Sequence, residues 1–85
     1  METEINNIED VVRFFTMLYE DYSLIFHPDS SFNEYVNLAT GEKTFTEDES
    51  FCLDGIMEDC FVECKESEVD IYDLAEEVYK TLKAK

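Results

Sequence analysis

The chain has 85 residues, of which 45% are hydrophobic, and its formal net charge is −16. This length fits one domain over residues 1–85, and the apolar content is too high for a disordered acidic tail. The charge excludes direct nucleic-acid binding, because phosphate would be repelled, and it argues against binding to anionic membranes. No apolar run is long enough for a membrane span, and the acidic start does not resemble a secretory signal, so we expect a cytoplasmic protein.

Apolar side chains recur at helical spacing over residues 8–22, which predicts an amphipathic first helix. Asn6 or Asn7 is expected to cap its start, because an asparagine side chain accepts hydrogen bonds from the free N–H groups of a first turn. Residues 1–6 are expected to be frayed. After the helix, residues 23–27 are predicted to be extended, either as a short edge strand or as a connector.

Residues 32–46 are predicted to form a β-hairpin. Tyr35, Val36 and Leu38 supply the first strand, and Gly41 permits the positive φ angle of a tight turn. A lone hairpin is marginally stable in water, so this one is expected to pack on the helices.

The clearest periodic signal predicts a second helix over residues 47–66. Thr46 and Glu49 have the spacing of a capping box, which marks where the helix begins. Six apolar residues then share one face. They are Leu53, Ile56, Met57, Cys60, Phe61 and Cys64.

A third helix is predicted over residues 70–83, again from apolar residues at helical spacing. Asp70 and Asp73 lie at its start, and Lys80 and Lys83 lie at its end. This order of charges complements the helix dipole, so it explains these lysines without a functional role.

The predicted order is therefore helix, β-hairpin, helix, helix, in a small and mainly helical α+β domain. The alternative is an all-α three-helix bundle in which residues 23–46 form a long loop. In either case the second helix is expected to provide the centre of the core. Its Leu53, Ile56, Met57 and Phe61 should pack against Val12, Phe15 and Tyr19 of the first helix and Leu74 and Val78 of the third.

No residue pattern predicts a catalytic, cofactor or metal site. Cys60 and Cys64 are expected to be reduced core thiols, since they lie on an apolar helix face and the chain has no Cys-x-x-Cys pair. A zinc site would need two further ligands, and only Cys52 and the single histidine, His27, are available. His27 lies next to Asp29 in turn sequence, and the acidic runs lack the spacing of a calcium-binding EF-hand loop.

The acidic residues are unevenly distributed. Residues 46–79 contain 13 Asp or Glu and one basic residue, Lys65, so this stretch carries −12 of the total charge. We therefore expect a non-enzymatic protein-interaction module that binds a basic protein partner through outward-facing acids. The alternative is an inhibitor that mimics nucleic acid and occupies a DNA- or RNA-binding protein. Rows of carboxylates at phosphate spacing would favour mimicry, whereas an apolar patch with an acidic rim would favour the interaction module.

Two sets of candidate contact residues follow. The acids predicted to bind the partner are Asp54, Glu58, Asp59, Asp73, Glu76 and Glu77. The apolar residues that fall off the main helical faces, and that would form a contact patch or a second layer of core, are Phe14, Met17, Phe51 and Val62.

Overall fold

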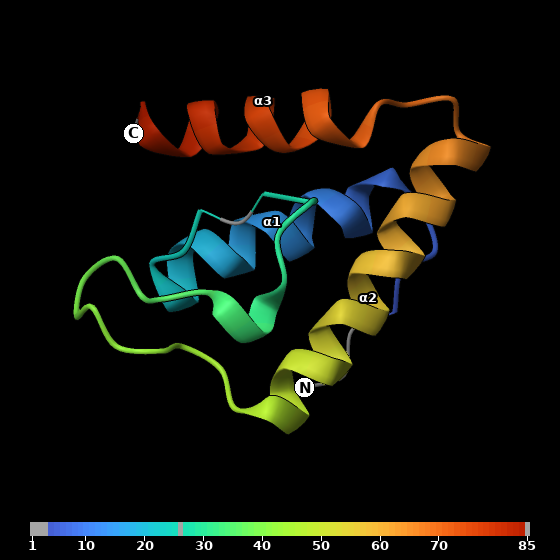
Figure 1. Cartoon of the computed structure of the whole chain (residues 1–85). Coiled ribbons are helices and arrows are strands. Elements are labelled where there is room, and N and C mark those ends of the chain that lie inside the picture. The colour runs from blue at the N-terminus through green and yellow to red at the C-terminus, as the bar shows by residue number, and fades with distance from the viewer. Residues whose placement is uncertain (1–3, 26, 85) are drawn as a thin grey trace.

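Three α-helices and one short 3-10 turn form the regular structure in the computed structural model, which describes residues 4–25 and 27–84. The helices are α1 (Ile8–Tyr22), α2 (Glu47–Glu66) and α3 (Ile71–Lys83), and the turn η1 (Phe32–Glu34) lies in the loop between α1 and α2. Helices α1 and α3 lie alongside each other and make the most extensive helix contact (Figure 1). Helix α2 crosses this pair and also packs on η1.

Side chains in the preceding residues fix where each helix begins. Asn7 accepts a hydrogen bond from the backbone N–H of Asp10 at 3.0 Å. At α2 the predicted capping box is present, because Thr46 Oγ1 accepts from the Glu49 N–H at 3.2 Å and Glu49 accepts from the Thr46 N–H. Asp70 accepts from two N–H groups in the first turn of α3. These local hydrogen bonds explain why the helix starts were readable from the sequence.

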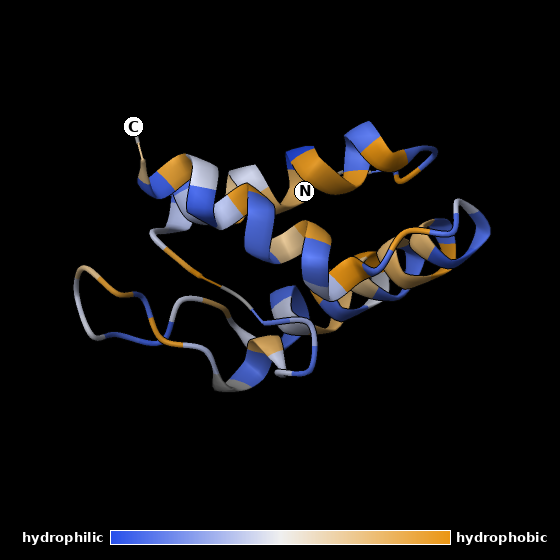
Figure 2. Ribbon diagram, turned by 90° about the horizontal axis from the view of Figure 1, so that it is seen from above, coloured by the Kyte–Doolittle hydropathy of each residue, from blue (hydrophilic) through white to orange (hydrophobic). Residues whose placement is uncertain are grey.

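The core is built around two fully buried aromatic residues of α1, Phe14 and Phe15. The Phe14 ring centroid lies 6.1 Å from that of Phe32 in η1, and Phe15 makes an edge-on contact with Tyr79 of α3 at 5.8 Å. Phe32 in turn contacts Phe45, just before α2, at 5.4 Å. Each helix therefore presents one apolar side to the interior, and hydrophobic and hydrophilic residues alternate along the ribbons (Figure 2).

The predicted positions of all three helices are confirmed. On α2, the predicted apolar face is buried along Leu53, Ile56, Met57, Cys60 and Cys64, a set that we call the inner stripe; Phe61 is half-buried at its edge. The predicted centre of the core was less accurate. Three residues that were expected at the centre of the core are only half-buried at its periphery, namely Val12, Tyr19 and Leu74. The centre is occupied by Phe14 instead.

The β-hairpin prediction is wrong, and the α+β class with it. Between residues 27 and 46 the only β-type pairing that the structure describes is one isolated antiparallel bridge, between Val36 and Lys43. Of the expected first strand, Tyr35 is half-buried against the core, but Val36 is 43% exposed and Leu38 is 65% exposed. In the described residues the chain is instead all-helical, with a long loop between α1 and α2. This is the three-helix arrangement that was the alternative prediction from the sequence.

Two kinds of contact replace the hairpin in ordering this loop. Phe32 and Phe45 are buried at either end of it and anchor it to the core. At its tip, the Asn37 side chain accepts hydrogen bonds from the N–H groups of Ala39 and Thr40, and its amide group donates to the Tyr22 carbonyl at the end of α1. The turn is therefore held by this side chain together with backbone hydrogen bonds across it, from the Asn37 N–H to the Glu42 carbonyl at 2.8 Å and from the Gly41 N–H to the Asn37 carbonyl at 2.9 Å.

Two predictions fall partly on residues that are not described. Residues 1–3 lie outside the described part of the chain, so the expected fraying concerns only residues 4–6. There, Ile5 packs against the core and the Asn6 N–H donates to the Asp10 carboxylate at 3.0 Å. Phe26, within the possible edge strand, is also outside the described residues; Leu24 and Ile25 form no strand.

None of the helices in the described residues is both long enough and apolar enough to cross a membrane.

A matched pair of phenylalanines tests this core. Phe14 is 1% exposed and Phe51, on α2, is 82% exposed. We expect Phe14→Ala to lower the free energy of unfolding by about 3–5 kcal/mol, because it leaves a cavity at the centre of the core. Phe51→Ala should change it by less than about 0.5 kcal/mol. Urea denaturation of both variants measures the difference, and similar losses in the two variants would contradict the placement of Phe14.

Candidate interaction surface

The side of α2 opposite the inner stripe is exposed and carries apolar residues at its centre. Phe51 is 82% exposed and Val62 is 56% exposed. Gly55 lies between them, and the spacing of four and seven residues places all three along one line of the helix. At the helical rise of 1.5 Å per residue, this line is about 16 Å long.

Charged residues lie on both sides of this line. We call the whole surface the outer face of α2. It comprises Glu47, Asp48, Phe51, Asp54, Gly55, Glu58, Asp59, Val62, Lys65 and Glu66, all exposed. Seven of its members are thus charged, and six of those seven are carboxylates.

The carboxylates of the outer face have no ion-pair partners among the described residues. Elsewhere in the described residues, Arg13 pairs with Asp10 within α1 at 3.8 Å, and His27 lies 3.8 Å from Asp29 in the loop, which is an ion pair only when the histidine is protonated. The outer face is therefore strongly negative, and its charge is available to a partner.

The predicted partner-binding acids divide into two groups. Asp54, Glu58 and Asp59 lie on the outer face of α2, next to Phe51 and Val62. The second group lies on α3 and is also exposed, but it does not belong to this face; its members are Asp73, Glu76 and Glu77. The α2 group flanks Phe51 and Val62, which are 82% and 56% exposed, whereas the exposed apolar neighbour of the α3 group is Tyr72, at 41%.

The predicted apolar patch divides in the same way. Phe14 is buried in the core, so it is not available as a contact residue, and Met17 is half-buried against the core. Phe51 and Val62 remain as the exposed pair. For Phe14 the second of the two expected possibilities applies, a second layer of core, because Phe32 from the loop covers a second side of α1.

The thiols are placed as their positions in the helix predict. Cys60 and Cys64 are buried, Cys52 is exposed, and all three are unpaired. Burial, with smaller contributions from Cys64 and Asp59, raises the pKa of the Cys60 thiol to about 12. Burial also raises the pKa of Cys64. Over the described residues, His, Cys, Asp and Glu side chains form no group of three that could hold a metal ion.

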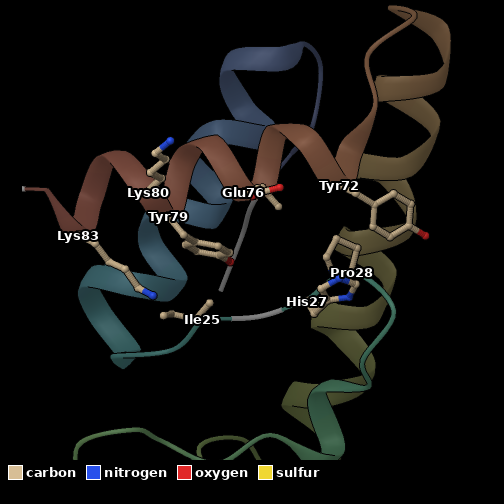
Figure 3. Close-up of a pocket in the computed structure, with 9 residues that line it drawn as sticks. Ile25, His27, Pro28, Tyr72, Glu76, Tyr79, Lys80 and Lys83 are labelled. Carbon is tan, nitrogen blue, oxygen red and sulfur yellow. The ribbon is translucent and has the colours of Figure 1, made fainter.

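A second concave site was not predicted from the sequence. It is a groove of about 440 Å³ between α3 and the loop segment that contains Ile25, His27 and Pro28 (Figure 3). Tyr72 and Tyr79 of α3 line its opposite side. We call it the α3 groove. No local pattern could have revealed it, because its two sides are more than forty residues apart in the chain.

Hydrogen bonds hold the loop side of the α3 groove in place. The Tyr72 hydroxyl donates to the Asp29 carboxylate at 2.8 Å, and this bond is the main cause of a raised pKa of Tyr72. The rings of His27 and Tyr72 lie 5.8 Å apart. On the other side, the His27 N–H donates to the Tyr35 hydroxyl at 3.1 Å, and that hydroxyl donates to the Ile25 carbonyl. His27 is thus a structural turn residue at the edge of a groove.

The chain matches no known protein-family model, no curated protein and no solved structure.

Thiol reactivity provides a test of the cysteine placement. In the folded protein at pH 8 we expect iodoacetamide to modify Cys52, whereas Cys60 and Cys64 react only after unfolding, because they are enclosed and almost fully protonated. Mass spectrometry of peptides from folded and urea-treated protein measures this. The control is Cys52→Ser, which should leave no rapidly modified thiol. Equal modification of all three cysteines in the folded state would contradict the placement.

The unpaired carboxylates also make stability depend on salt. We expect the melting temperature to rise between low salt and about 0.3 M NaCl, since screening weakens repulsion among the acids of a chain with charge −16. Neutralising Asp54, Glu58 and Asp59 together as Asn, Gln and Asn should raise the low-salt melting temperature and reduce the salt effect. A melting temperature that falls as salt is added would mean that attractive ion pairs dominate.

Proposed function

We propose that this protein is a non-enzymatic interaction module that binds a basic protein partner through the outer face of α2. The observation that carries the proposal is the exposed pair Phe51 and Val62 at the centre of a surface whose carboxylates have no partners among the described residues. Both side chains lie on the side of α2 that faces away from the inner stripe, so they contribute little to the buried core. A partner that covers them would remove apolar area from water.

The two kinds of residue on the outer face would do different work. Phe51 and Val62 supply affinity, because desolvated apolar anchors near the centre of an interface contribute most of its binding energy. The surrounding acids supply attraction at a distance and orient the partner, mainly by raising the association rate. The partner accordingly needs an apolar hollow or ridge with Lys or Arg around it.

The chemistry of the thiols supports a binding role over a catalytic one. A nucleophilic cysteine needs a lowered pKa and access to substrate. Cys60 and Cys64 are buried and their pKa values are raised, which is the opposite of activation.

The same apolar centre favours an interaction module over mimicry of nucleic acid. A surface that imitates a phosphate backbone would be negative throughout, whereas the acids of the outer face flank an apolar line of Phe51, Gly55 and Val62 along its middle. Direct binding to nucleic acid is disfavoured by the charge, since the surface repels phosphate.

The experiment compares two triple charge reversals that change the net charge equally. The first replaces Asp54, Glu58 and Asp59 with Lys on α2, and the second replaces Asp73, Glu76 and Glu77 with Lys on α3. A partner captured from native lysate by the unaltered protein is then measured against both variants at 0.15 M salt. We expect the α2 reversal to weaken binding at least tenfold, mainly through slower association, and the α3 reversal to weaken it less than threefold.

The apolar anchors are tested separately by Phe51→Ala with Val62→Ala. This double variant should bind at least tenfold more weakly through faster dissociation, while its melting temperature stays close to that of the unaltered protein. The proposal fails if the captured partner binds both triple variants equally, or if it tolerates loss of both anchors.

A further inference from the structure

The α3 groove differs from the outer face of α2 in the sign of its charge. Lys80 and Lys83 line it together with one acid, Glu76. Two ammonium groups and one carboxylate give the lining a net charge of +1 when His27 is neutral, in a chain whose total is −16. Two of the six basic residues of the protein are therefore gathered at one concave site.

The lysines are available to a ligand. Within the described part of the chain, neither Lys80 nor Lys83 has a carboxylate within ion-pair distance. The Lys83 side chain extends toward the end of the groove formed by Ile25, and Lys80 points away from the groove at its rim (Figure 3). Lys83 is thus the cation best placed to meet a group that lies in the groove.

The rest of the lining is mostly apolar and held in place. Ile25 and Pro28 form one side, and Ala75 with the ring of Tyr79 forms the other. Pro28, Ala75 and Tyr79 are buried, so this surface belongs to the packed part of the molecule. The Tyr72–Asp29 hydrogen bond fixes the loop against α3, which makes the groove largely preformed. A volume of about 440 Å³ lies in the range of small-molecule sites.

We propose that the α3 groove binds a small organic monoanion with an apolar body, an alkyl or aryl carboxylate. The apolar body would lie against Ile25, Pro28 and Ala75, and the carboxylate would reach the Lys83 ammonium. A cation would be repelled by the Lys83 ammonium, the charge that extends toward the groove, and a polyanion would be repelled by the acids of the surrounding surface. At physiological ionic strength the screening length is about 8 Å, so the distant acids of α2 oppose a single negative charge only weakly.

Titration of the ¹⁵N-labelled protein with decanoate at 0.15 M NaCl, followed by NMR, tests this site. Decyltrimethylammonium serves as the cationic probe with the same chain length, and acetate serves as the head group alone. We expect decanoate to shift the amide signals of Ile25, His27, Ala75 and Tyr79. The cation should bind there at least tenfold more weakly, and acetate should give no saturable shift.

Lysine variants then locate the charge contact. Lys83→Gln should weaken decanoate binding about two- to fivefold, the effect of losing one solvent-exposed ion pair. Lys65→Gln, which removes the same charge from the outer face of α2, should leave it unchanged. The proposal is overturned if decanoate does not bind at millimolar concentration, if the cation binds as tightly, if the shifts map to α2, or if both lysine variants behave alike. None of these results bears on binding of a protein partner at α2.

Discussion

The enclosure of α1 is the constraint on which the rest of the structure depends. Phe14 and Phe15 point in different directions from neighbouring positions of the helix, and both must be covered. Helix α3 covers the Phe15 side through Tyr79, and the Phe14 side is covered by Phe32 from the loop. Because the loop covers this side of α1, where a four-helix bundle would place another helix, α2 contributes only its inner stripe to the core. Its opposite side is then left exposed, including Phe51 and Val62.

The uneven charge follows from the same arrangement. The acids of α2 lie on the side that the core does not use, so they accumulate on one surface. On α3 the charges are ordered along the axis, with Asp70 and Asp73 at the start and Lys80 and Lys83 in the last turn, where cations complement the helix dipole. The same lysines line the α3 groove. The helix dipole is therefore enough to explain why Lys80 and Lys83 lie at the end of α3. The same two residues also give the lining of the α3 groove its positive charge.

Sequence patterns predicted the features that depend on local chemistry and missed those that depend on distant contacts. Periodicity and the Thr46–Glu49 capping box gave α2 its bounds, because both act within a few residues. The turn signal at Gly41 was also genuine: its φ is +75°, and the Val36–Lys43 bridge lies where the hairpin was expected. A two-stranded hairpin is stable only when one of its faces is buried, however. Here the buried residues are Phe32 and Phe45, at the two ends of the segment, and the residues between them that would form the strands stay largely exposed. The acids of α2 could be predicted to be exposed because they lie on the side of the helix opposite the buried inner stripe. The α3 groove could not be predicted, because it forms only when distant segments of the chain pack together.

Gly55 links the fold to the proposed interaction. A glycine inside a helix costs about 1 kcal/mol relative to alanine. A Cβ atom at Gly55 would meet no other atom within 4 Å, so no internal packing requires the glycine. Phe51 is 82% exposed, so packing of the core does not require a phenylalanine at this position either. Positions that break a local rule without compensation inside the molecule are those where an external requirement acts. In the complex proposed above, a residue without a side chain between Phe51 and Val62 would give a partner's backbone room to approach the helix, and the acids around it would favour a basic partner at that position.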